Sequence, residues 1–253
     1  MTEKVKLPIR GGAIVILIFV TLNLLGQAKT VITKDDQFRT EKQALIDTLN
    51  NRINIDCPFV IGRYHPPVND TVNHPYFNSN KWINGSLFYD GRFYSVENLK
   101  YDIETDHLIH LKLTSLMLDC IAMDENFISE FRLANQTFRY YSGLRDKRGG
   151  KVKDGYYEVV FDGKLKFLVR SEKSLSIKEG ANYLVYSTWV RMYLLKENKM
   201  ISINSLSGLL KQLNRESRDS VKKFIRNNLL KLNSSNYTSA STVLHFYENR
   251  QGL

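Results

Sequence analysis

The chain has 253 residues, of which 36 are Lys or Arg and 26 are Asp or Glu, so its formal net charge is +10. This length suffices for one large β domain or for one domain with a helical appendage. A basic chain in the cytoplasm could bind nucleic acid, but the export signal described next excludes that use. The acidic partners that remain are anionic lipid, lipopolysaccharide and polysaccharide, unless the basic surface serves solubility alone.

The first 28 residues are typical of an export signal. Lys4, Lys6 and Arg10 precede an apolar run over residues 13–25, and Gly26-Gln27-Ala28 places small residues where a signal peptidase reads them. The run is too short for a mature helix across a bilayer, which needs roughly 20 residues. We therefore expect cleavage after Ala28, a periplasmic or extracellular location and no membrane span in the mature chain. The alternative is an uncleaved inner-membrane anchor.

Residues 29–55 are predicted to form an N-terminal helical segment. Apolar residues of the stretch 36–51 fall near one helical face, and Asp35 or Asp36 can cap its start. Residues 56–204 are predicted to form an antiparallel β domain, and residues 205–253 a helical cap packed on it.

The β domain is organised around the turn Tyr89-Asp90-Gly91-Arg92. Asp-Gly between aromatic and branched residues is the strongest local hairpin signal, because both central residues of the turn need a positive φ. Residues 87–89 and 93–96 should therefore pair. Past a second turn at Glu104-Thr105-Asp106 a third strand follows, and alternation predicts that its buried face carries Ile109, Leu111 and Leu113.

A second Asp-Gly hairpin is predicted around Asp162-Gly163, and residues 184–195 should pair with 200–203. Both faces of the strand 184–195 are apolar, so it should lie centrally, with the C-terminal helices over one side. The basic stretch 145–155 is interpreted as a solvated, mobile loop, with polyanion capture as the alternative.

Three short helices are predicted at the C-terminus, with Ser205, Ser217 and Thr238 or Ser239 as their caps. The second helix carries an outer basic face that could bind an anion, formed by Arg218, Lys222 and Arg226. Two short basic helices resemble a helix-turn-helix in outline. We reject nucleic-acid binding because of the export signal and because no motif-specific residue supports it.

Two cysteines, Cys57 and Cys120, are the whole complement of the chain. In an oxidising compartment they could form a disulfide. Cys120 lies in an apolar stretch where a buried thiol is equally compatible, so both possibilities remain open.

No catalytic or phosphate-binding motif with fixed spacing occurs, and no cofactor is predicted. The densest polar cluster contains Asp102, Asp106, His107 and His110. Asp106 with His110 could serve as metal ligands or as an acid/base pair, but a polar hairpin turn followed by an outward histidine explains the same pattern. His65 and His74 are scattered loop residues that could join a site only if the fold brings them there.

Several motifs resemble an uncharacterised family of secreted proteins of Gram-negative bacteria. They are HPYF at 74–77, W-x-x-G-x-L-x-YDG-x-x-Y at 82–94, LKYDI-x-x-D at 99–106, GYYEVVFDGKLKFLVR at 155–170 and VRMYLLKENKMISINSLSGLLKQL at 190–213. The resemblance covers most of the mature chain. It implies secretion and supplies no activity.

The sequence therefore predicts a mainly β protein with some α: a curved antiparallel meander or partly closed barrel, with an N-terminal helix and a small C-terminal helical cap. We expect a non-catalytic secreted or periplasmic envelope protein with a binding or assembly role, whose partner is an envelope protein, a lipid or a polysaccharide. The alternative is an exported hydrolase-like enzyme that uses carboxylate and histidine residues at the rim of the sheet. The oligomeric state is left open.

Overall fold

The computed structural model describes residues 62–66, 68, 71–113, 118–178, 180 and 183–251. The chain divides into the units Met1–Ile53 and Asn54–Leu253, and all that follows concerns the second. The predicted export signal, the helix over 36–51 and Cys57 lie outside the described residues.

Thirteen strands of the described residues form one sheet. Their bounds are β1 Gly62–Tyr64, β2 Thr71–Val72, β3 Ile83–Tyr89, β4 Arg92–Asp102, β5 His107–Leu113, β6 Leu118–Met123, β7 Ile128–Leu133, β8 Gln136–Tyr141, β9 Arg145–Asp146, β10 Gly155–Asp162, β11 Lys166–Ile177, β12 Leu184–Lys196 and β13 Lys199–Ser202. The helices are the 3-10 turns η3 Glu125–Phe127 and η4 Arg215–Ser217, and the α-helices α3 Leu206–Leu210, α4 Arg218–Asn227 and α5 Ser239–Gln251.

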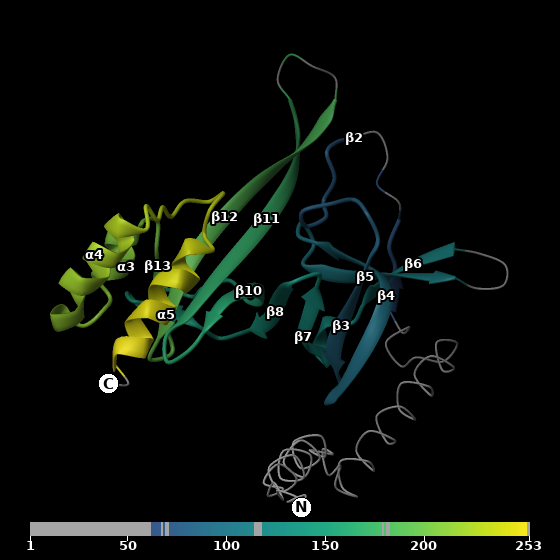
Figure 1. Ribbon diagram of the computed structural model, residues 1–253. Coiled ribbons are helices and arrows are strands. Elements are labelled where there is room, and N and C mark those ends of the chain that lie inside the picture. Colours follow the sequence, from purple (N-terminus) through teal and green to yellow (C-terminus); the bar gives the residue numbers. More distant parts are fainter. Residues whose placement is uncertain are drawn as a thin grey trace, which may run out of the picture. The chain divides into compact units, whose positions relative to one another are not determined.

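The predicted fold class is confirmed. The order across the sheet is β1-β6-β5-β4-β3-β7-β8-β10-β11-β12-β13-β9, with β2 beside β12. Most neighbours are antiparallel, and the curved sheet stays open because its two ends do not pair (Figure 1). We call β1 and β3–β8 with η3 the first half, and β10–β13 with η4, α3, α4 and α5 the second half.

The first half is built on the predicted Asp-Gly hairpin. Asp90 and Gly91 both have positive φ, at 45° and 76°, and β3 pairs with β4 from Tyr89 with Arg92 onward. A second positive φ, at Asn98, accompanies a register shift that keeps Val96 and Leu99 in one core. Aromatic and aliphatic side chains fill this core, including Leu87, Tyr101, Phe131, Phe138 and Tyr156.

In β5 the predicted burial of Ile109 is confirmed, and its neighbour Leu108 is buried as well. Leu108 pairs with Tyr101 and joins the core of the first half, whereas Ile109 pairs with the buried Lys100 on β4. Successive residues of a strand point to opposite faces, so both faces of the sheet are buried here, and alternation did not predict the burial of Leu108.

In the second half, the predicted helical cover is confirmed. Apolar residues of β10–β13 and of α3, α4 and α5 share one core, in which Phe167, Met192 and Leu194 meet Val221 and Val243. The three helices lie on one face of this part of the sheet (Figure 1). None of the helices within the described ranges is long and apolar enough to span a bilayer.

The opposite face of the second half is covered by residues 141–155, of which sequence patterns assigned 145–155 to a solvated loop. Leu144 and Val152 pack against a third core formed by Tyr157, Leu168 and Met200. Within this stretch β9 pairs in parallel with β13. The basic residues suggested that the stretch faces solvent, but Leu144 before them and Val152 among them determine where the segment packs.

The strands β11 and β12 continue past their neighbours as a two-stranded hairpin. The ladder of β10 with β11 extends only to Val169, that of β13 with β12 only to Tyr193, and β2 touches β12 at Leu184 and Val185 alone. We call residues 173–178 with 183–188 the arm; it stands clear at the top of Figure 1.

Candidate functional site

The turn between β4 and β5 joins the two halves through Asp106. The carboxylate of Asp106 accepts the Tyr101 hydroxyl at 2.5 Å and pairs with the Arg170 guanidinium of β11 at 3.0 Å. Arg170 is only 3% exposed, and its other nitrogens donate to the Glu172 carboxylate and the Tyr156 carbonyl. Burial by itself lowers the pKa of Arg170, but Asp106 and Tyr101 raise the pKa by more than burial lowers it. The net pKa is raised, so the guanidinium stays charged.

The backbone around Gly155 is shaped to fit this ion pair. Gly155 has a φ of +138°, which side chains rarely adopt, and a Cβ there would collide with the Asp106 carboxylate. The next amide, of Tyr156, donates to the same carboxylate at 3.3 Å. Asp106 therefore satisfies buried donors from both halves and has a structural role, so the predicted ligand or acid/base role is not supported by its surroundings.

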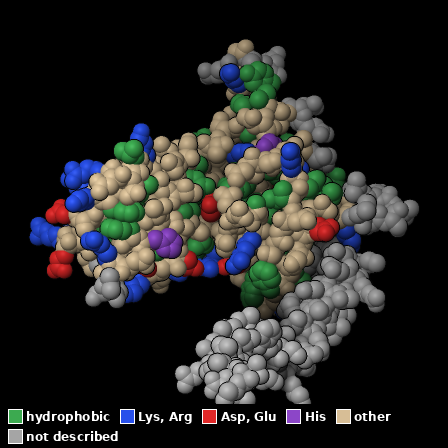
Figure 2. Space-filling model, in the orientation of Figure 1, with side chains coloured by type: hydrophobic (Ala, Val, Ile, Leu, Met, Phe, Trp, Pro, Cys, Tyr) green, Lys and Arg blue, Asp and Glu red, His purple; other side chains and the backbone are tan. Residues whose placement is uncertain are grey.

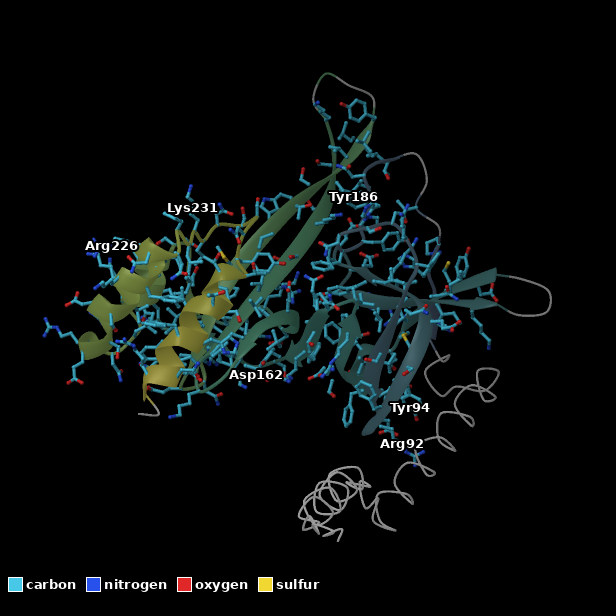
Figure 3. All side chains as sticks on the ribbon, in the orientation of Figure 1. Arg92, Tyr94, Asp162, Tyr186, Arg226 and Lys231 are labelled. Atoms are coloured by element: carbon cyan, nitrogen blue, oxygen red, sulfur yellow. The ribbon has the colours of Figure 1, made fainter. Side chains whose placement is uncertain are left out.

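Further contacts hold the same turn and the HPYF segment, residues 74–77, against the arm. The Tyr186 hydroxyl donates to Glu104 at 3.0 Å, and Figure 3 labels this tyrosine on β12. Lys173 donates to the carbonyls of His74 and Tyr76 at 2.7 and 2.8 Å. Burial lowers the pKa of Lys173. We call the Asp106–Arg170 ion pair together with these contacts the joint. The HPYF segment is therefore part of the joint between the two halves.

A cleft of about 430 Å³ opens on the first half, lined by residues of β1, β5, β6 and the turns beside them. His65 lies on one side, with its Nε2 3.7 Å from the fully buried Asp102 carboxylate and 3.4 Å from the Tyr76 hydroxyl. The Asp102 carboxylate also accepts the amides of Glu104 and Thr105. We call this space the histidine cleft.

His107 lies in the same cleft, because it pairs across the strands with Asp102. Its Nε2 is 3.4 Å from the Glu125 carboxylate. Burial is the largest cause of a lowered pKa at His65, although Asp102 raises it, and His107 contributes to the lowering. Two histidine–carboxylate pairs thus share one open cleft.

The four residues of the predicted polar cluster therefore do not form one site. His107 lines the histidine cleft, Asp102 is buried next to His65, and Asp106 lies in the joint. His110 has its Nδ1 3.1 Å from the Glu97 carbonyl, and burial lowers its pKa. No group of three or more His, Cys, Asp or Glu is arranged to hold a metal within the described part of the chain.

The sequence analysis missed a second hollow, of about 390 Å³, which we call the aromatic pocket. Phe88 and Phe93 face each other across the β3–β4 hairpin, and Tyr140 of β8 completes the aromatic lining. These rings are 38%, 52% and 37% exposed. A signal existed: Phe88 alternates with the buried Leu87 and Tyr89, so alternation places an aromatic ring on the outward face.

The floor of the aromatic pocket is charged and rigid. Arg139 donates to Glu130 through two nitrogens, at 3.0 and 2.8 Å, and to Asp162 at 3.0 Å. Glu130 and Arg139 are also cross-strand partners in β7 and β8. Ser129 adds a hydroxyl to the lining. The pocket combines flat apolar surfaces with fixed polar groups.

The other predicted site residues are separate from both hollows. Arg218 donates to the carbonyls of Leu213 and Lys211, so it holds the loop before α4. Lys222 and Arg226 are exposed on the outer side of α4, where Figure 3 labels Arg226. Cys120 lies part-buried on β6, and burial raises the pKa of its thiol. The predicted disulfide to Cys57 remains untested.

No family model, curated protein or solved structure matches this chain. The resemblance inferred from the motifs remains a prediction.

Proposed function

We propose that this chain is a non-catalytic exported binding protein and that the aromatic pocket binds a saccharide unit of an envelope polysaccharide. The proposal depends on one observation: three exposed aromatic rings surround a hollow with a charged floor. Its volume of about 390 Å³ falls in the usual range for small-ligand sites, about 300–1,000 Å³.

The chemistry of the lining favours a sugar over an apolar ligand. Rings of Phe88, Phe93 and Tyr140 offer flat faces for the C–H surfaces of a pyranose, while Glu130 and Arg139 offer a charged acceptor and donor for hydroxyl groups. Glu130 and Arg139 are already paired, so they need no rearrangement to present their free edges. A protein partner is less favoured, because a stable interface needs about 20–30 residues on each side.

Titration calorimetry with soluble tetrasaccharides of glucose, mannose and N-acetylglucosamine tests the proposal. We expect one of them to bind, and Phe93→Ser to weaken binding by roughly tenfold or more, because a central aromatic contact carries much of the affinity of such sites. Phe127→Ser is the matched control, since Phe127 is 46% exposed and does not line the pocket. Equal weakening by both variants, or no binding by any of the sugars, would refute the proposal.

The histidine cleft supports a second candidate, an exported hydrolase. Two histidine–carboxylate pairs, at 3.7 and 3.4 Å, face one open cleft, which is the arrangement that general acid–base catalysis requires. The distances exceed a good hydrogen bond, as is common before substrate binds.

A panel of chromogenic esters, phosphomonoesters and glycosides tests this candidate. Turnover of any member that is lost in His107→Gln and kept in His110→Gln would support it, because His110 lies outside the cleft lining. Turnover that survives in both variants would show that the histidine cleft is not the site of the activity.

A further inference from the structure

We propose that the arm of β11 and β12 inserts its apolar face into the interfacial region of an anionic lipid bilayer. The proposal is independent of the aromatic pocket. It starts from Leu175, Ile177 and Leu184, three large aliphatic side chains that are 37%, 73% and 37% exposed on a two-stranded hairpin.

These three side chains form one continuous apolar strip. Leu175 pairs with Tyr186 and Ile177 pairs with Leu184, and directly opposed residues of an antiparallel pair project to the same face. The strip begins where Tyr186 is buried at the joint and extends outward from it. Figure 2 shows hydrophobic atoms together with a basic side chain at this end of the molecule.

The other face of the arm is polar. Ser174 pairs with Ser187, and Ser176 pairs with Val185. The arm is therefore amphipathic across its thickness, with an apolar face and a serine-rich face, as in peptides that lie in the plane of a membrane interface. Such a ribbon places its apolar face toward the acyl chains and leaves its hydroxyl groups in the headgroup layer.

Residues at the end of the strip are of the interfacial kind. Tyr183 is 39% exposed, and the Lys178 ammonium lies 5.7 Å from the centre of its ring. Tyr and Lys side chains both keep an apolar stem in the acyl boundary while the polar tip stays in water. Glu179 follows Lys178 in the sequence, so attraction to anionic headgroups comes from the net positive charge of the chain as a whole. The formal charge is +10 over all 253 residues, and loss of residues 1–28, which hold three basic residues and one acidic residue, leaves it positive.

The size of the strip distinguishes a bilayer from a protein partner. A stable protein interface needs about 20–30 residues on each side, whereas shallow insertion needs only a few apolar side chains aided by electrostatic attraction. The exposed strip has three aliphatic side chains, and Tyr183 lies beside its outer end. It fits the second requirement and falls short of the first.

The test uses the full chain with a single tryptophan as a depth reporter. Trp82 and Trp189 are the two native tryptophans, so Trp82→Phe and Trp189→Phe with Tyr183→Trp leave one reporter at the end of the arm. Vesicles contain phosphatidylglycerol with phosphatidylcholine, brominated or not along the acyl chains. We expect a blue shift and quenching by the brominated lipid, weaker in vesicles without phosphatidylglycerol.

Two matched variants separate the arm from any other membrane contact, including one by the apolar residues 13–25. Adding Ile177→Ser should reduce the quenching at least severalfold, while circular dichroism stays unchanged because Ile177 is 73% exposed. A reporter placed instead by Phe93→Trp should show little quenching. Equal quenching at 93 and 183, none at 183, or a dimer in size-exclusion chromatography that Ile177→Ser disperses would overturn the proposal.

Discussion

The two halves of the sheet use the same alternating strands but differ in what covers them. In the second half, helices cover one face and residues 141–155 cover the other, so both faces are core. The first half has one continuous core and leaves the aromatic pocket and the histidine cleft open on its surface. Both candidate binding sites, the aromatic pocket and the histidine cleft, therefore lie in the first half, where fewer segments cover the sheet. The second half, with both faces covered, has a structural role.

The halves also differ in titratable groups. His65, His74, His107 and His110 all belong to the first half, and His245 alone belongs to the second. There the exposed His245 ring lies edge-on against Phe161, at 4.7 Å between ring centres. Conditions that protonate histidine should therefore act on one half much more than on the other.

The largest expected effect comes from breaking the joint between the halves. Arg170→Met should destabilise the protein by about 3–5 kcal/mol, because it leaves Asp106 and Glu172 without their buried partner. Urea denaturation measures the loss. The matched control is Arg132→Met: Arg132 is exposed and 3.7 Å from Glu130, so we expect a loss of about 1 kcal/mol or less. Similar losses in the two variants would show that Asp106–Arg170 does not hold the joint.

Hydrogen exchange sharpens the same comparison. In the wild type, amides of β3–β5 and of β10–β12 should open at similar free energies, as expected of one cooperative unit. In Arg170→Met, the first half should open at a lower free energy than the second, because only the second keeps its helical cover. Uniform loss of protection over both halves would contradict the idea that the joint couples separate cores.

An intermediate effect is expected at the start of α3. The Ser205 hydroxyl accepts the Gly208 amide at 3.1 Å, so Ser205→Ala should cost about 1 kcal/mol. Ser217→Ala should cost less, because the Ser217 side chain makes no capping bond to α4. Thermal unfolding followed by circular dichroism compares the two variants, and a larger loss at 217 would contradict the assignment.

The smallest expected effect is that of pH. Burial lowers the pKa values of His65, His74 and His110 below 6.5, so the unfolded chain takes up protons more readily than the folded one as the pH falls. The stability that their neutral forms contribute is complete above pH 6.5 and declines on acidification through and below it. Urea midpoints at about pH 7.5 and about pH 5.5 should differ less in His65→Gln than in the wild type. An equal difference in both proteins would assign the pH effect to other groups.

Local patterns predicted much of the fold. Asp90-Gly91 predicted a hairpin because few residue pairs adopt two positive φ values at low cost, and the turn appears where expected. Ser205 predicted a helix start, which appears there. The apolar pattern on both faces of β12 predicted a strand covered along its length, but only its second part is covered, because Leu184 and Trp189 are 37% and 48% exposed. Each prediction depends on neighbours within a few residues.

The candidate sites could not be predicted in the same way. The residue that binds Asp106 is Arg170, 64 positions along the chain, and no local pattern connects them. His65 reaches Asp102, and Tyr140 reaches Phe88, only through the strand order. Alternation predicted the burial of Ile109 but not that of its neighbour Leu108, which is buried on the opposite face.

What the sequence by itself determined was the set of strands, turns and helices, since φ preferences, alternation and capping act over a few residues. What only the tertiary structure decided was which distant residues meet. It pairs Asp106 with Arg170 and Asp102 with His65. It also places Tyr140 beside Phe88 and Phe93 in the aromatic pocket. The reason is physical, because hydrogen bonds and ion pairs act over a few ångströms in space, and the distances between distant segments depend on the order in which the strands pair.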